Sequence, residues 1–315
     1  MSGPSETTLT LLSEIASLGD SLQKGEQGAR KALISTASQL ISTLSHPPEN
    51  ALHLLLGQPT HLSVIRMAVE IHLFRAMLST PPTGESSAAI AQRCEPKGVV
   101  DPVLVGRMLR HLAAMSTVLE VGADLFAPSP TSAAYASQAY QDAILFTVDN
   151  FQRALDAGPA YFRERNWKVP TSGVDAPFQY AFKCANTHYF EYFERFDQEM
   201  GRRFASMMDV WSMGKERWFD EDYYPVGERL VDGAETADEG EEKVFLVDVG
   251  GAVGHDVKGL RAAFGEKIPG KLVLQDRPEV VERVDLDPPD EKMPHDFLTE
   301  QPVKGTSPPP PSPSP

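Results

Sequence analysis

The stretch FLVDVGGAVGHD, residues 245–256, decides the fold of the C-terminal part of the chain. It opens with a short run of apolar residues rich in Val, which is typical of a buried parallel strand ending near Asp248. The glycines that follow predict a tight turn into a helix, DVKGLRAAFG. A second strand, KLVLQD, comes next and ends on Asp276. The order strand, glycine turn, helix, strand indicates an α/β unit with a parallel sheet.

This arrangement also has a chemical use. Bare backbone at Gly250, Gly251 and Gly254 lets a ligand touch the main chain, and the helix start offers free N–H donors. Asp276 lies 22 residues after Gly254, close to the spacing at which an acid accepts the hydroxyls of a ribose. Gly250, Ala252 and Gly254 occupy the alternating positions of a DxGxGxG pattern rather than GxGxxG. The pattern suits S-adenosylmethionine, which carries no phosphate.

Three blocks in order make the pattern specific. They are VDVGGAVGHD, LVLQDRPEVVE and MPHDFLTEQPVKG. Together they resemble the S-adenosylmethionine-dependent O-methyltransferases of fungal secondary metabolism, which are related to the plant caffeic acid-type enzymes. The resemblance runs from about residue 30 to Gly305. It implies an N-terminal winged-helix dimerisation domain followed by a Rossmann-like catalytic domain.

The resemblance also assigns roles in holding the cofactor. It implies that the backbone around Gly250 and Gly251 holds the amino-acid part, that Asp276 holds the ribose, and that the adenine lies at Asp296 and Phe297. Ala252 departs from the pattern, because many relatives have glycine there. The predicted cofactor-binding residues are Asp248, Gly250, Gly251, Gly254, Asp276, Asp296 and Phe297.

The resemblance places the general-base His in a segment after Gly305, where this sequence reads TSPPPPSPSP. A proline-rich stretch favours an extended segment that cannot join the interior of a sheet. We therefore expect an incomplete Rossmann-like domain, a chain without the C-terminal catalytic segment and weak turnover at most. No catalytic residue and no metal ligand is predicted.

The remaining chain divides by its composition. Residues 84–126 read as helix, helix and hairpin, the pattern of a winged helix, with Asp101 as the N-cap of the second helix. Acids dominate the stretch GERLVDGAETADEGEEK, which predicts a solvated loop. The predicted parts are a disordered N-terminus over 1–30, a mostly α winged-helix dimerisation domain over 31–135, a helical connector with substrate-pocket helices over 136–230, an acidic loop over 231–243, a partial Rossmann-like domain over 244–305 and a Pro-rich tail over 306–315.

Within 136–230 an aromatic and Met stripe, HYFEYFERFDQEMGRRFASMMDVW, repeats at helical spacing. Such a stripe most often belongs to a hydrophobic core. Its alternative reading is the wall of a pocket for a flat apolar substrate. On that reading Phe204, Met208 and Trp211 line the pocket, and the substrate is a phenol such as an aromatic polyketide.

Several classes of partner are disfavoured. The formal charge of −15 over 315 residues repels phosphate, and residues 84–126 carry four basic and five acidic residues where a DNA-reading helix needs a basic face. Neither a membrane span nor a secretion signal is visible, so the cytosol is the default compartment. The two cysteines have no metal-ligand spacing.

We expect a homodimeric O-methyltransferase. The alternatives are a non-catalytic or repurposed relative, such as a dimer partner or a pericyclase-like protein that keeps the cofactor, and then a winged-helix DNA-binding regulator.

Overall fold

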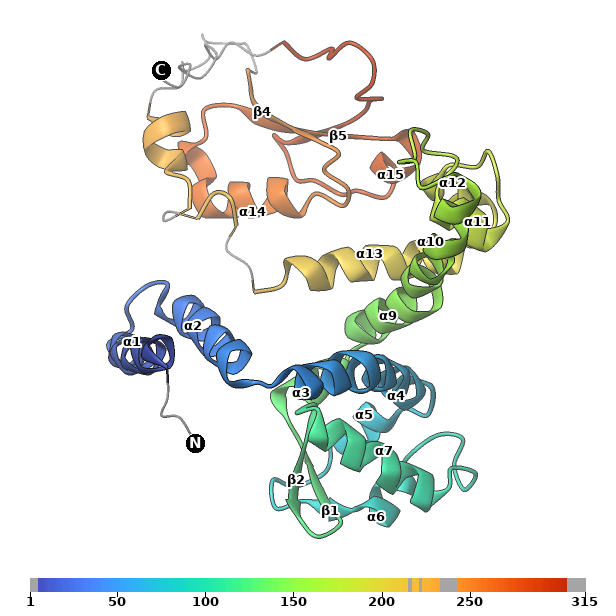
Figure 1. Cartoon of the computed structure of the whole chain (residues 1–315). Helices are drawn as coiled ribbons and strands as arrows, with labels where there is room; N and C mark the ends of the chain where they lie inside the picture. Colours follow the sequence, from blue (N-terminus) through green and yellow to red (C-terminus); the bar gives the residue numbers. More distant parts are fainter. Residues whose placement is uncertain (1–4, 215–216, 221–222, 233–242, 305–315) are drawn as a thin grey trace. The chain divides into compact units, whose positions relative to one another are not determined.

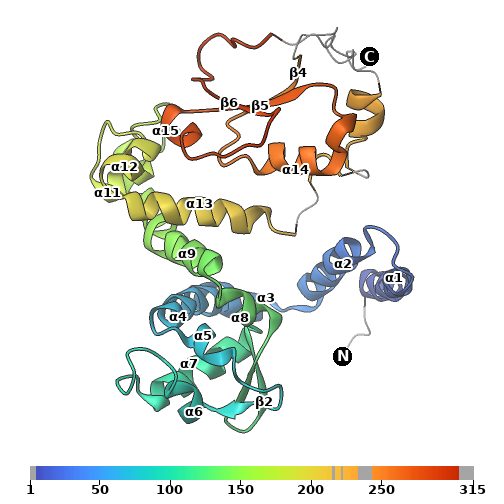
Figure 2. The same ribbon diagram turned by 180° about the vertical axis from the view of Figure 1, so that it is seen from behind.

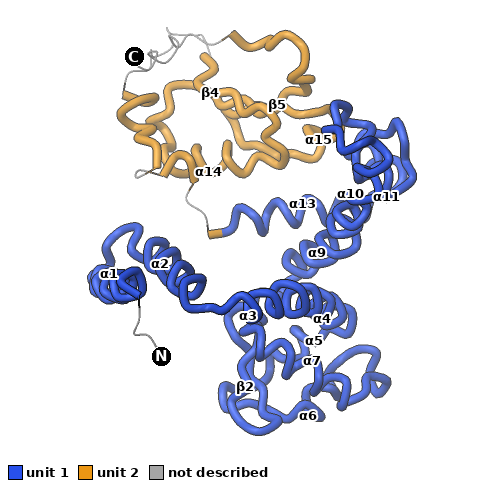
Figure 3. The backbone as a smooth tube through the Cα atoms, in the orientation of Figure 1, with its two compact units in different colours: residues 1–213 blue, residues 214–315 orange. Residues whose placement is uncertain are grey.

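The computed structural model describes residues 5–214, 217–220, 223–232 and 243–304. The chain forms two compact units, Met1–Met213 and Gly214–Pro315, which Figure 3 shows in blue and orange. Each unit has its own hydrophobic core.

The first unit is mainly helical (Figure 1). Its elements are α1 (Glu6–Gln23), α2 (Ala29–Leu44), α3 (Pro47–Leu52), the π-helical turn η1 (His53–Gly57), α4 (Gln58–Glu70), α5 (Leu73–Met77), β1 (Glu85–Ser86), α6 (Ser87–Ala91), α7 (Pro102–Ala114), β2 (Val118–Gly122), β3 (Leu125–Pro128), α8 (Pro130–Tyr135), α9 (Gln138–Phe146), η2 (Thr147–Gln152), α10 (Arg153–Glu164), α11 (Pro177–Phe182), α12 (Tyr189–Arg195) and α13 (Gln198–Ser212).

The helix, helix, hairpin order over 84–126 is present. Asp101 caps α7 by accepting the Val103 N–H at 2.8 Å, as predicted. Strands β2 and β3 form an antiparallel hairpin, and β1 pairs with β3, which gives the sheet order β1-β3-β2. The main core is built from α4 to α7 and the hairpin strands, and Leu73, Leu109 and, on β3, Phe126 are fully buried.

The predicted disorder of residues 1–30 is wrong, because α1 occupies Glu6–Gln23 and begins at the N-cap Ser5. Helices α1 and α2 pack side by side, as both ribbon views show (Figures 1 and 2). Leu11 and Ala29 are buried in this pair. A short helix is marginal in isolation, so the order of this region depends on the packing of α1 against α2.

Two apolar stretches of the first unit are each divided between two helices. The stretch around residues 61–78 forms α4 and α5, separated by Ile71 and by His72 at φ 51°. The aromatic and Met stripe forms α12 and α13, because Asp197 accepts the Met200 N–H and starts a new helix. Phe193 and Met200 then pack with Phe146 and Phe178 in one buried cluster, which we call the aromatic cluster.

The second unit contains the parallel sheet. Its elements are η3 (Gly227–Val231), β4 (Val244–Val249), α14 (His255–Phe264), η4 (Gly265–Lys267), β5 (Lys271–Asp276), α15 (Pro278–Val281) and β6 (Glu291–Pro294). The strand order is β4-β5-β6, with Asp248 beside Leu274 and Asp276 beside Pro294. Helix α14 covers one face of the sheet (Figure 1) and buries Val257 and Leu260.

The predicted domain boundary near residue 230 also differs. Residues from Gly214 onward belong to the second unit, because Phe219 and Val226 are buried in its core with Leu260. The predicted boundary was placed at the acidic stretch because the composition changes there, and composition does not reveal this packing. Most of the predicted acidic loop, residues 233–242, and the predicted Pro-rich tail lie outside the described residues.

Candidate cofactor-binding site

The turn between β4 and α14 is held by one carbonyl group of the neighbouring strand. The N–H groups of Gly250 and Gly251 donate to the main-chain oxygen of Gln275 at 2.7 and 3.2 Å. Gly250 and Gly254 have φ values of 78° and 79°, in the left-handed region that favours glycine. An added Cβ at Gly250 would meet no atom within 4 Å, so the surface of the turn there is open.

Asp276 lies at the carboxyl end of β5 and reaches back to this turn. Its Oδ2 accepts the Ala252 N–H at 2.9 Å, and its Oδ1 accepts the Arg277 N–H at 2.7 Å. Ala252 has φ 47°, the left-handed conformation that a methyl side chain disfavours. The structure therefore brings together the glycine turn and the acid that the sequence predicted to act with it.

Asp248, at the end of β4, lies beneath the turn. An added Cβ at Gly251 would stand 2.6 Å from its Oδ2, so this glycine is required by close packing. Burial raises the pKa of the Asp248 carboxyl, and the nearby Asp256 and Asp276 act in the same direction. Three carboxyl groups therefore lie close enough to interact at this end of the sheet.

Asp296 and Phe297 follow β6 in an exposed turn. Asp296 accepts the Leu298 N–H at its Oδ1, and its main-chain oxygen accepts the Thr299 N–H. The Phe297 side chain is 66% exposed. The His295 N–H donates to the Asp276 main-chain oxygen at 2.9 Å, which places this turn beside the end of β5.

Sequence reasoning missed β6 and the role of Gln275. The EKMP strand has no alternating pattern, so nothing local indicates it. Gln275 is polar within an otherwise apolar strand yet only 1% exposed. A buried amide in such a strand is a signal that a polar partner exists, although it does not name the partner.

The predicted substrate residues lie on α13 in the first unit. The Phe204 ring packs 5.5 Å from Phe146 and 5.6 Å from Phe193, between ring centroids, and so belongs to the aromatic cluster. Met208 and Trp211, nearer the end of α13, are 42% and 61% exposed. The stripe is therefore part of the core at Phe204 and exposed on the surface at Met208 and Trp211.

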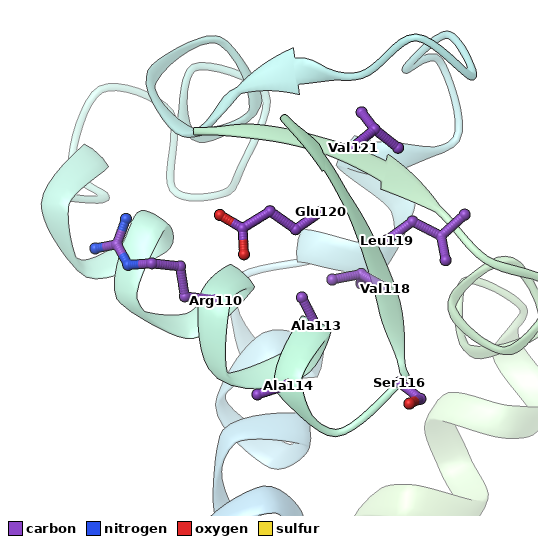
Figure 4. A pocket seen from close by; sticks show the side chains of 8 residues that line it. All are labelled: Arg110, Ala113, Ala114, Ser116, Val118, Leu119, Glu120 and Val121. Carbon is purple, nitrogen blue, oxygen red and sulfur yellow. The ribbon is translucent and has the colours of Figure 1, made fainter. Parts of the chain in front are cut away.

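A hollow of about 450 Å³ lies elsewhere in the first unit, between α7 and the hairpin. Figure 4 shows the Glu120 carboxylate pointing toward the side on which Arg110 lies, above a floor that includes Ala113 and Val118. It contains none of the predicted site residues. Among the described residues no group of three or more His, Cys, Asp or Glu could hold a metal ion, and no described helix is long and apolar enough to cross a membrane.

Curated proteins with similar sequences are fungal enzymes. The chain is 33% identical over 310 residues to O-methyltransferase mpaG of Penicillium brevicompactum, covering 94% of this chain and 72% of that protein. It is 29% identical over 310 residues to methyltransferase cfoC of Aspergillus candidus, with the same two coverages. No family model matches the chain.

Solved structures show the same fold. A LepI complex with SAM matches with a TM-score of 0.74 and 23% identity, covering 94% of this chain and 72% of that one. OxaC in complex with SAH and oxaline matches with a TM-score of 0.67 and 22% identity, covering 95% and 73%. The chain thus has the Rossmann-like fold of these proteins.

Proposed function

The chain belongs to the family of fungal O-methyltransferases, and from that premise we propose that residues 244–304 bind S-adenosyl-L-methionine for methyl transfer to a hydroxyl group of an aromatic secondary metabolite. The observation that carries the proposal is the meeting of the Gly250–Gly254 turn with Asp276 at adjoining strand ends. The relatives' names and the SAM- or SAH-bound neighbours support it.

The described residues fit such a cofactor. Asp276 uses two acceptor positions on main-chain N–H groups, and a carboxylate has about four. Acceptors therefore remain for ribose hydroxyls. The open space beside Gly250 leaves room for the amino-acid part, and the carboxyl groups of Asp248, Asp256 and Asp276, which lie near enough to interact, favour a positively charged ligand.

S-Adenosyl-L-methionine would supply a methyl group on a positively charged sulfur. The chain's own residues would bind and orient it, since in-line transfer depends mainly on holding two reactants in register. Asp276 and the turn fix the nucleoside end, and the exposed Phe297 offers a face for the adenine. We assign no general base to any described residue.

For the acceptor we propose a phenol such as an aromatic polyketide. Met208 and Trp211 support this, because they present large apolar surface at the end of α13. Flat aromatic molecules bind to such surface through burial and offset stacking.

We further propose that the first unit is a winged-helix dimerisation domain and that two copies associate. The N-terminal helices support this, because their large apolar side chains are exposed in the single chain. The most exposed of them are Ile41, Leu52, Leu54, Leu55 and Leu56. Sedimentation of the unmutated chain should show a dimer, and Leu55→Glu should shift it to a monomer, whereas Val169→Glu, at an exposed site in the loop after α10, should not.

Calorimetry with S-adenosylhomocysteine tests the cofactor. Asp276→Ala should weaken binding at least about tenfold, because two hydrogen bonds to a charged group are lost. Asp285→Ala, at an exposed acid of the same unit, is the matched control and should bind normally. Absence of binding by the unmutated chain would refute the proposal. Binding without methylation of any phenol would favour the repurposed relative.

A further inference from the structure

Gln275 has two sets of contacts that lead to different parts of the candidate site. Its main-chain oxygen accepts the Gly250 and Gly251 N–H groups, as described above. Its side-chain amide faces the other way, toward Gln301. The Gln275 Nε2 donates to Gln301 Oε1 at 2.8 Å, and the Gln301 Nε2 donates to Gln275 Oε1 at 2.7 Å.

These two bonds close a ring between the amides, which we call the Gln275–Gln301 amide pair. Within the pair each amide donates once and accepts once, so its orientation is defined. The Gln275 Nε2 also donates to Met293 Sδ at 3.3 Å. Because Gln275 is 1% exposed, the bonds form away from water, where an unpaired amide would be costly. Gln301 Oε1 also accepts the Val303 N–H at 3.0 Å.

Apart from this pair, the segment that it anchors is linked to β5 at its N-terminal edge, where the His295 N–H donates to the Asp276 main-chain oxygen at 2.9 Å. Residues 296–304, the 296–304 segment, contain no helix or strand. Phe297 and Leu298 are 66% and 84% exposed, so apolar burial does little to order them. The hydrogen bonds of Asp296 to the Leu298 and Thr299 N–H groups are local and shape the turn without fixing its position.

We propose that the Gln275–Gln301 amide pair positions the 296–304 segment relative to the glycine turn, and so sets the adenine side of the cofactor site in register with the ribose and amino-acid side. Gln275 and Gln301 are positioning residues. This inference rests on the proposed function for its effect on the cofactor. A neutral amide pair suits the task, because it places no charge at the buried Gln275 position.

Hydrogen exchange on the chain without ligand tests the positioning directly. Gln301→Leu should lower protection of the Leu298 and Thr299 amides at least about tenfold, because the segment loses its side-chain link to β5. The Gly250 and Gly251 amides should keep their protection, since they donate to a main-chain oxygen. Glu300→Gln is the matched control, because this neighbouring side chain is exposed and pairs with Lys304, and it should change neither group.

A pH profile separates positioning from general support of the fold. In Gln301→Glu a protonated carboxyl can still donate once and accept once, whereas the ionised form has no donor for Gln275 Oε1. Protection of the Leu298 and Thr299 amides in this variant should fall as pH rises through the pKa of the new carboxyl. It should stay level in the unmutated chain after correction for intrinsic exchange. A level profile in the variant would overturn the inference.

Binding then links the pair to the cofactor. Gln301→Leu should weaken S-adenosylhomocysteine binding about tenfold. Glu300→Gln and the unmutated chain are the references, and their melting temperatures are measured beside that of Gln301→Leu. Unchanged protection and unchanged affinity in Gln301→Leu would refute the positioning role. Should the unmutated chain fail to bind S-adenosylhomocysteine, the proposed function fails, but the exchange experiments still decide whether the pair holds the segment.

Discussion

Substituting Gly251 with Ala probes the packing on which the cofactor turn depends. The new Cβ would stand 2.6 Å from Asp248 Oδ2, 2.8 Å from its Cγ and 3.0 Å from Leu274 Cγ. Forcing a methyl group into such a site typically costs about 1–3 kcal/mol. We expect a loss of stability in that range, measured by urea unfolding with the fluorescence of Trp218, which packs against the core of the second unit.

The adjacent glycine supplies a control with a different cause. Gly250→Ala meets no atom within 4 Å, but it places a Cβ at φ 78°, which costs about 1–2 kcal/mol through backbone strain alone. Removing the Asp248 carboxylate distinguishes the packing cost at Gly251 from the backbone strain at Gly250. In an Asp248→Ala background the cost of Gly251→Ala should fall by about 1 kcal/mol or more, whereas the cost of Gly250→Ala should not change.

This double-mutant cycle separates the two causes. The energy of a contact between residues 251 and 248 depends on both side chains, whereas backbone strain at residue 250 does not depend on the Asp248 side chain. If Gly251→Ala costs the same with and without the Asp248 carboxylate, close packing between these two residues is not what requires glycine at 251. The reasoning from the structure would then be wrong. A coupling of the expected sign would also show that the buried acid shapes the turn from below.

Three further outcomes are expected. Gly270→Ala should destabilise the chain by about 3 kcal/mol in thermal unfolding, because the new Cβ would overlap the main-chain carbonyl oxygen of Lys243, which cannot rotate aside; a normal melting temperature would contradict this. Arg261→Met should cost about 3–5 kcal/mol in urea, because it leaves the carboxylate of Asp290, 5% exposed and 2.5 Å from the guanidinium, without its partner; an unchanged midpoint would count against it. Asp248→Asn should raise stability at neutral pH. The folded-state pKa of the Asp248 carboxyl is raised, so the contribution of this carboxyl to folding stability is fully present below its ordinary pKa of 3.8. That contribution is lost as pH rises through the folded-state pKa. The gain of the variant over the unmutated chain should therefore vanish below pH 3.8, and a gain that is independent of pH would refute the assignment.

Local patterns predicted the cofactor half of the fold well. The apolar run before Asp248, the glycines after it and the second run ending at Asp276 all became the expected elements. The cap at Asp101 was correct for the same reason. Strands, caps and glycine turns are decided by neighbours within a few residues, so a single sequence contains the information.

Predictions that depended on packing between distant segments were weaker. The N-cap at Ser5 is local, but the packing of α1 against α2 also depends on residues beyond 30. Phe219 and Val226 lie before the acidic stretch, yet they belong to the second core. Phe204 fits a core stripe and a pocket wall equally well by spacing, and only its ring contacts place it in the aromatic cluster.

The sequence by itself determined the family, the parallel strand, turn and helix unit, and the identity of the acid at the second strand end. Only the tertiary structure decided that this acid accepts the Ala252 N–H and that Gln275 pairs with Gln301. The physical reason is that helical and strand periodicity is written in neighbouring residues. A hydrogen bond between residues 24 or 26 positions apart exists only once strand order and register have brought the two groups together.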